Sequence, residues 1–129
     1  GNPDGHLVLR GGKAGPNFQS EVVTEVATEL DQAGLYDRLM IDCSHDNSKK
    51  DFRRQSDVLN AVARQVRNGS NHVMGVMLES HLVEGNQKLS EDLSCLTYGQ
   101  SITDACIGMP TTETLLAALA DAISSVSPR

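Results

Sequence analysis

Residues 74–108 read MGVMLESHLVEGNQKLSEDLSCLTYGQSITDACIG, and the interpretation of the whole chain depends on this stretch. The apolar run at residues 73–78 stops at Glu79, and roughly thirty residues without a helical or strand period follow. A loop of that length inside a compact domain is usually functional or disordered. The runs ESHLVEGNQ and SITDACIG carry little of the Ser, Pro and Lys bias of disordered segments. The sequence therefore predicts a buried strand that leads into an ordered active-site loop.

Upstream and downstream of this stretch, short apolar runs alternate with helical periodicity. Further strands are predicted at residues 6–10 and 39–41, because each run is apolar and closed by glycine or polar residues. Apolar side chains spaced three or four residues apart predict three amphipathic helices. These cover residues 19–33 with Gly34 as the C-terminal cap, residues 52–66 after a Ser48-to-Asp51 cap, and a last helix from Thr111 or Thr112 to Val126, ended by Pro128.

This order of elements predicts an α/β fold with a parallel sheet. Near-continuous apolar strands separated by amphipathic helices are typical of such sheets. The strand ends at Arg10, His45 and Glu79 recur at intervals of about 35 residues, the length of one strand-plus-helix unit. A closed (β/α)8 barrel needs about 250 residues. We therefore expect one partial domain over residues 1–129, with two open sheet edges, and interpret the start without methionine as a cut in a longer chain.

Composition excludes several functional classes. The net charge of −6 argues against non-specific nucleic-acid binding through a basic field. No apolar run approaches the ~18 residues of a membrane span, and no signal segment opens the chain. Three cysteines without framework spacing favour the reducing cytoplasm over a disulfide scaffold. Small buried apolar side chains are the simplest interpretation of Cys43, Cys95 and Cys106.

The candidate metal site consists of His45, Glu79 and Asp104. Parallel strands end at one edge of the sheet, so His45 and Glu79, with Asp104 from the following loop, are expected on the same rim. One imidazole and two carboxylates suit a divalent transition metal, although each residue alone has an ordinary structural explanation. His81 is either a partner of these ligands or a packed loop histidine.

Arg10 and Lys13 flank two glycines at the end of the first strand. A planar guanidinium beside flexible backbone suits a phosphate or carboxylate. The alternative is a solvated strand-end cation, which the residues by themselves favour. A solvated helix face is the simpler explanation of Lys49, Lys50, Arg53 and Arg54.

Four motifs together resemble the carboxy-terminal part of a known enzyme family. GNPDGHLVLRGGK at residues 1–13, MIDCSHDNSKK at 40–50, GVMLESHLVEGNQ at 75–87 and YGQSITDACIG at 98–108 are similar to type I 3-deoxy-D-arabino-heptulosonate 7-phosphate (DAHP) synthase, in its feedback-regulated form. The resemblance extends from Gly1 to about Val126. ESHLVEGNQ and SITDACIG distinguish the chain from the related KDO8P synthases, which share the barrel and the chemistry.

The resemblance implies the last three βα units of a (β/α)8 TIM barrel. It also implies the first step of the shikimate pathway, which leads to the aromatic amino acids. The family condenses phosphoenolpyruvate with erythrose 4-phosphate, and releases phosphate. Its divalent metal, of the manganese, iron, cobalt or zinc class, is held by a cysteine, a histidine, a glutamate and an aspartate. The last three fall on His45, Glu79 and Asp104, and the arginine that contacts the phosphoenolpyruvate phosphate falls on Arg10.

The family's metal cysteine and most of its substrate-binding cations belong to the upstream part of the barrel. We therefore expect this chain to be inactive alone. Its two open sheet edges predict association as a homo-oligomer. Its charge, its cysteines and its short apolar runs predict a cytoplasmic enzyme that binds neither nucleic acid nor membranes. The alternative is a stand-alone half-barrel that binds a metal or an oxyanion without turnover.

Overall fold

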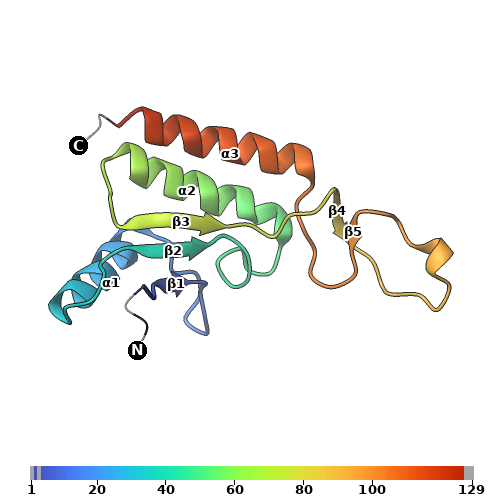
Figure 1. Ribbon diagram of the computed structural model, residues 1–129, viewed down its shortest axis with the longest axis horizontal. Coiled ribbons are helices and arrows are strands. Elements are labelled where there is room, and N and C mark those ends of the chain that lie inside the picture. Colours follow the sequence, from blue (N-terminus) through green and yellow to red (C-terminus); the bar gives the residue numbers. More distant parts are fainter. Residues whose placement is uncertain (1, 3, 127–129) are drawn as a thin grey trace.

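The computed structural model describes residue 2 and residues 4–126, and its centre is a three-stranded parallel sheet (Figure 1). The strands pair in chain order: β1 (Leu7–Leu9), β2 (Leu39–Asp42) and β3 (Val73–Met77). Three α-helices accompany them: α1 (Ser20–Gln32), α2 (Gln55–Arg67) and α3 (Met109–Ser124). α3 lies along α2 (Figure 1). The prediction of parallel strand-helix units in an unclosed sheet is confirmed.

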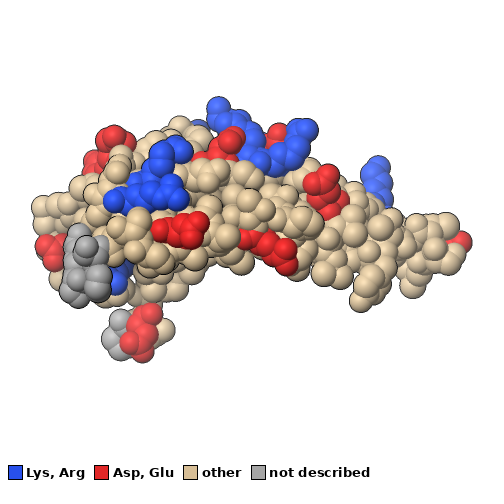
Figure 2. All heavy atoms as spheres, turned by 90° about the horizontal axis from the view of Figure 1, so that it is seen from above, with Lys and Arg blue, Asp and Glu red and all other residues tan. Residues whose placement is uncertain are grey.

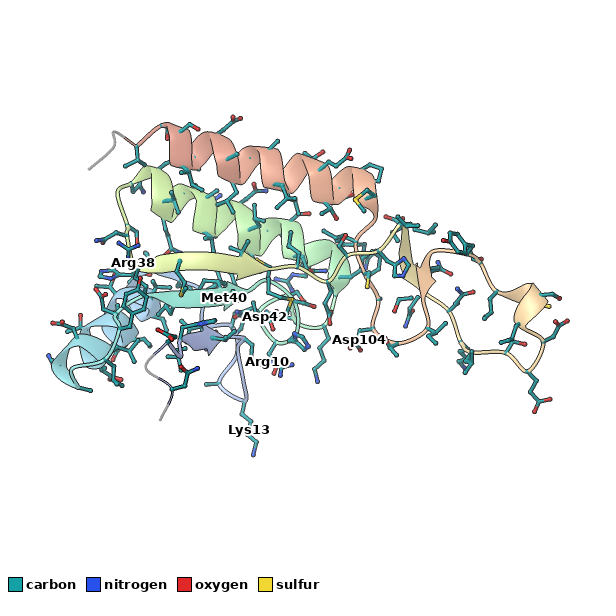
Figure 3. The ribbon with its side chains drawn as sticks, viewed as in Figure 1. Arg10, Lys13, Arg38, Met40, Asp42 and Asp104 are labelled. Carbon is teal, nitrogen blue, oxygen red and sulfur yellow. The ribbon has the colours of Figure 1, made fainter. Side chains whose placement is uncertain are left out.

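The core lies between the helices and one face of the sheet. Strand residues Leu9, Leu39 and Ile41 pack there against side chains from α1, α2 and α3, chiefly Val23, Val58, Leu59, Val62 and Leu115. Successive strand residues point to opposite faces, so Val8 and Met40 lie on the other face. Val8 is 42% exposed there. The sheet is therefore packed on one side and open on the other. Figure 3 labels Met40 and Asp42 of β2 and Arg10, the residue that follows β1.

α2 begins later than the sequence predicts. Ser48 does not cap it; its hydroxyl donates to the carbonyl of His45. Lys49 and Lys50 both have positive φ angles, of 54° and 61°, which breaks any helix across them. The carboxylate of Asp51 instead accepts from the Arg53 N–H and caps a 3-10 turn, η1 (Phe52–Arg54), that leads into α2.

The start of α3 also differs from the prediction. Gly108 is the N-cap, not Thr111 or Thr112, and Pro110 lies in the first turn. Proline favours this position because its fixed φ suits the helix and its missing N–H has no helical partner there. The predicted end at Pro128 lies outside the described residues. Gly34, with φ 67°, follows α1 as predicted.

The long stretch after β3 is ordered but is not one active-site loop. It contains β4 (Val83–Asn86), the 3-10 turn η2 (Leu93–Cys95) and β5 (Gln100–Ser101), with β4 and β5 paired in parallel. Residues 83–101 form an arm that projects away from the sheet (Figure 1). The Gln87 side-chain amide pairs with the Thr97 main chain at 2.8 Å in both directions and closes the tip of the arm.

Charge is distributed without a single dominant sign on the face that Figure 2 displays. Basic and acidic side chains are interspersed on this face, and few charged side chains are seen over the arm from this side (Figure 2). Among the described residues, no helix has both the length and the apolar character that a membrane crossing requires.

Candidate metal and anion site

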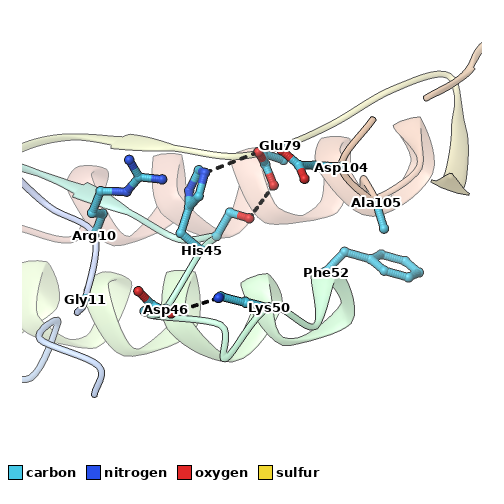
Figure 4. Close-up of a pocket in the computed structure, with 10 residues that line it drawn as sticks. Arg10, Gly11, His45, Asp46, Lys50, Phe52, Glu79, Asp104 and Ala105 are labelled. Atoms are coloured by element: carbon cyan, nitrogen blue, oxygen red, sulfur yellow. Dashed lines mark hydrogen bonds and ion pairs between the residues drawn. The ribbon is translucent and has the colours of Figure 1, made fainter. Parts of the chain in front are cut away.

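A pocket of about 600 Å³ opens at the carboxyl ends of the strands. Its lining comes from the ends of all three strands, from the loop before α2 and from the segment after β5 (Figure 4). The residues are Arg10, Gly11, Ser44, His45, Asp46, Lys50, Phe52, Glu79, Asp104 and Ala105.

His45, Glu79 and Asp104 converge in this pocket as predicted. Each offers one ligand atom, and these atoms all lie within 4.8 Å of one another. His45 Nε2 is 3.6 Å from Glu79 Oε1. Separations of this size are those of donors that surround one ion, and an imidazole with two carboxylates is a donor set for a divalent metal. The residues present therefore fit such an ion.

His45 is held by its backbone and by a buried carboxylate. Its φ angle of 49° lies in the left-handed region, which costs a non-glycine residue about 1–2 kcal/mol. Its Nδ1 lies 2.7 Å from Asp42 Oδ2, the distance of an ion pair, and makes no hydrogen bond to the described residues. Asp42 is only 3% exposed, and its Oδ1 accepts from the Ser44 N–H at 2.8 Å. With Nδ1 directed at Asp42, Nε2 is left facing Glu79.

Glu79 is held by its side chain and by its main chain. The Ser44 hydroxyl donates to Glu79 Oε2 at 2.5 Å. The buried amide of Gln55, at the start of α2, accepts from the Glu79 N–H at 2.8 Å and donates to its carbonyl at 3.0 Å. Only Oε1, of the two carboxylate oxygens, faces His45.

Asp104 reaches the pocket because the segment after β5 pairs with the chain just beyond β3. The Ile107 N–H donates to the Glu79 carbonyl at 2.9 Å, and the His81 N–H donates to the Ile107 carbonyl at 3.0 Å. Asp104 itself is exposed, in contrast to the part-buried Glu79. It is the most solvent-accessible member of the cluster.

Arg10 lies on the same rim as the metal cluster. Its Nε is 3.9 Å from Asp42 Oδ2, and its side chain is 59% exposed, so the guanidinium remains available to a ligand. The buried Asn47 amide donates to the carbonyls of Leu9 and Asp42 and so ties the ends of β1 and β2 together. Lys13, in contrast, points away from the pocket at the tip of its loop (Figure 3).

The basic residues before α2 are not simply a solvated helix face. Lys49 and Lys50 precede the helix, and Lys50 lines the pocket while its Nζ lies 4.0 Å from Asp46 Oδ1. Arg53 pairs with Asp51 at 2.9 Å, which lowers the pKa of that carboxyl. Lys50 is thus a second cation of the pocket that the sequence interpretation missed.

The remaining predictions concern His81 and the cysteines. His81 is exposed, and its Nδ1 accepts from the Leu82 N–H, so it is neither packed nor among the pocket residues. Cys43 and Cys106 are buried as predicted, but Cys95 is exposed on the arm. Burial, with Asp42 nearby, raises the pKa of Cys43 to about 12.

Three supporting residues of the site were not predicted. Asp42 and Ser44 belong to the strand-end run that also contains His45, and a carboxylate three residues before a candidate ligand was a usable signal. Gln55 carried no comparable signal, because it meets Glu79 only through the packing of α2 on β3.

Comparisons with known proteins show which family the sequence is similar to. The model of the DAHP synthetase I family matches residues 1–117. The Tyr-sensitive phospho-2-dehydro-3-deoxyheptonate aldolase of Enterobacter agglomerans is 52% identical over 116 residues, which are 90% of this chain and 54% of that protein. The Phe-sensitive aldolase of Escherichia coli K12 is 51% identical over 125 residues, 97% of this chain and 35% of that protein.

A solved structure shows that the similarity includes the fold. The phospho-2-dehydro-3-deoxyheptonate aldolase of Francisella tularensis SCHU S4 superposes with a TM-score of 0.91 at 45% identity, over 97% of this chain and 36% of that one. The unclosed sheet thus corresponds to part of a barrel. The chain spans from about a third to just over half of the length of these relatives. On its sequence and its fold, it belongs to the DAHP synthetase I family.

Proposed function

We propose that this chain forms the metal-binding and phosphoenolpyruvate-binding rim of a DAHP synthase, which condenses phosphoenolpyruvate with erythrose 4-phosphate to DAHP and phosphate. The observation that carries the proposal is the convergence of His45, Glu79 and Asp104, with ligand atoms within 4.8 Å, in the pocket that also contains Arg10. Family membership supports it, because the relatives carry aldolase names for this product.

In this proposal His45, Glu79 and Asp104 hold a divalent metal of the manganese, iron, cobalt or zinc class. The metal would supply Lewis-acid polarisation of the aldehyde carbonyl. Asp42 keeps the His45 ring directed at the site, and Ser44 leaves one Glu79 oxygen free to coordinate. A further ligand from elsewhere in the barrel can complete this set of three protein ligands.

Arg10 binds the phosphate of phosphoenolpyruvate in the same proposal. Its guanidinium offers paired donors to a phosphate, and its exposed side chain lies at the pocket rim. Two phosphorylated substrates need several cations to offset their repulsion. Among the described pocket residues, Arg10 and Lys50 are the cations, so other parts of the barrel must supply more.

A chimera tests the proposed function. The segment of the Escherichia coli Phe-sensitive relative that this chain matches would be replaced by this chain, and phosphate release would be measured with phosphoenolpyruvate, erythrose 4-phosphate and manganese. We expect turnover by the chimera and none by this chain alone. Because groups that act as a unit are not additive, a partial site should retain little of the rate.

Matched variants assign the activity to the residues named above. His45→Ala and Glu79→Gln should abolish turnover in the chimera, and Arg10→Ala should raise KM for phosphoenolpyruvate more than it lowers kcat. Lys13→Ala, at a cation that points away from the pocket, is the control and should leave both constants unchanged. A folded but inactive chimera whose grafted chain still binds manganese would favour the alternative of a metal-binding module without turnover.

A further inference from the structure

Gln55 is fully buried, and both the oxygen and the nitrogen of its side-chain amide form hydrogen bonds with the main chain of Glu79. It is 0% exposed at the first position of α2. Its Oε1 accepts from the Glu79 N–H at 2.8 Å, and its Nε2 donates to the Glu79 carbonyl at 3.0 Å. A buried amide costs free energy unless it is hydrogen-bonded, so this orientation is strongly favoured.

This pairing occurs where the sheet no longer supports the chain. The pairing between β2 and β3 ends at Asp42 and Met77, with a last bond from the Cys43 N–H to the Met77 carbonyl. Glu79 lies two residues beyond, and Gln55 bonds its main chain as a neighbouring strand would. The Ile107 N–H adds a second bond to the Glu79 carbonyl. The backbone of Glu79 is thereby fixed, and with it the direction in which the side chain leaves.

We propose that Gln55 is a positioning residue for the Glu79 carboxylate in the metal cluster. It sets the backbone of Glu79 so that Ser44 can bind Oε2 while Oε1 faces His45 Nε2 at 3.6 Å. This role rests on the proposed function, because it is defined by the metal that Glu79 would hold. Gln55 itself does not line the pocket and acts only through Glu79.

The same helix provides a matched control. Gln65, also on α2, is 8% exposed, and its Nε2 donates to the Phe18 carbonyl at 2.7 Å. It therefore makes the same kind of bond, from a buried amide to the main chain of another segment, but it lines a different pocket. Loss of either amide should destabilise the fold, whereas only Gln55 leads to the metal cluster.

The experiment compares Gln55→Met and Gln65→Met in the 129-residue chain, by cobalt(II) titration followed by visible absorption and by thermal unfolding. Methionine approximates the volume of glutamine without its polar ends. We expect Gln55→Met to weaken cobalt binding roughly 10- to 100-fold, and Gln65→Met to change it by less than about twofold, although both lower the Tm. Amide exchange at Glu79 should accelerate in Gln55→Met only.

Gln55→Asn is the second variant, for the case that Gln55→Met does not fold. It keeps the amide but shortens its reach, so it should weaken cobalt binding while leaving more of the stability. Equal cobalt affinities in the Gln55 and Gln65 variants would overturn the positioning role and leave the metal site intact. Absence of any cobalt spectrum from the unaltered chain would instead overturn the metal site, and the role of Gln55 with it.

Discussion

At the scale of single residues, one buried carboxylate connects the two halves of the site. Asp42 Oδ2 lies 2.7 Å from His45 Nδ1 and 3.9 Å from Arg10 Nε. The same oxygen therefore faces a candidate metal ligand and a candidate phosphate ligand. Groups placed behind a metal ligand in this way orient it, so Asp42 can fix the direction of the imidazole beside the guanidinium.

Replacing Asp42 by Asn should weaken metal binding without unfolding the protein. An asparagine oxygen can still accept from the Ser44 N–H, but the charge beside His45 Nδ1 is lost. We expect cobalt(II) or manganese affinity to fall roughly tenfold, in the range measured for groups that orient metal ligands. Asp46→Asn is the control, because Asp46 lines the pocket but pairs with Lys50. Equal affinities in the two variants would contradict this role of Asp42.

The three thiols should differ sharply in reactivity. Cys95 is exposed, whereas Cys43 and Cys106 are buried. Burial raises the pKa of Cys43 to about 12 and also raises that of Cys106, so both remain protonated at pH 8. Because the thiolate is the nucleophile, Ellman's reagent should modify one thiol rapidly in the native protein. Cys95→Ser should remove that phase, and a second rapid thiol would show that a buried cysteine is accessible.

At the scale of elements, the loop after β1 packs on the loop after β2 through a glycine. Gly11 has a φ of 77°, and a Cβ there would lie 2.8 Å from Asp46 and Asn47 backbone atoms. This close approach places Arg10 beside the loop that carries His45. The spacing of the two strand ends therefore depends on the absence of a side chain at residue 11.

A series of glycine-to-alanine variants separates backbone strain from crowding. Gly34→Ala, at φ 67° in open space, should lower the free energy of unfolding by about 1 kcal/mol. Gly11→Ala adds the clash and should cost about 3 kcal/mol or more. Gly12→Ala meets neither problem and should stay within about 0.5 kcal/mol. Urea unfolding measures all three, and equal losses for Gly11 and Gly34 would show that the loops can separate.

The elements that could be predicted are those with a periodic apolar face. The strands before Arg10, His45 and Glu79 and the helices between them follow from such periods, because burial on the sheet requires them. The starts of α2 and α3 were missed because they depend on local conformations, such as the positive φ of Lys49 and Lys50 before α2. The arm was missed because β4 and β5 are short and pair outside the main sheet.

Site residues at strand ends could be predicted from the sequence. Residues that support the site through contacts between distant positions of the chain could not. The convergence of His45 and Glu79 could be predicted because parallel strands bring their ends to one edge, and that of Asp104 because the following loop returns to it. The bonds from Ser44 and Gln55 to Glu79 cross 35 and 24 positions of the chain. No period or spacing in the sequence encodes such contacts.

At the scale of the whole molecule, the sheet is incomplete on one face and at its edges. β1 and β3 are its outer strands, and Val8 is 42% exposed on the open face. Exposed strand edges and apolar faces promote association. The same face would be the interior of a closed barrel, where neighbouring strands would cover it.

We therefore expect this chain to self-associate. Light scattering over a range of concentrations should give a mass that rises above 13.9 kDa. Val8→Lys places a charge on the open face and should shift the mass toward that of the monomer, since a charge there opposes burial. Lys13→Glu, on an exposed loop, is the control for a change of charge alone. A constant monomer mass for the unaltered chain would refute the expectation.

The closure of the arm by Gln87 has a consequence for how this protein can vary over evolutionary time. The Gln87 amide and Thr97 join the two sides of the arm at 2.8 Å and enclose nine positions between them. A change in the length of this enclosed segment therefore need not displace β4 and β5. The entropic cost of lengthening such a loop grows only slowly with the number of residues. Insertions, deletions or a grafted peptide tag can therefore be accommodated at the tip while Glu79 and Asp104 keep their separation. The residues of the site and the shape of the arm can then change independently of each other.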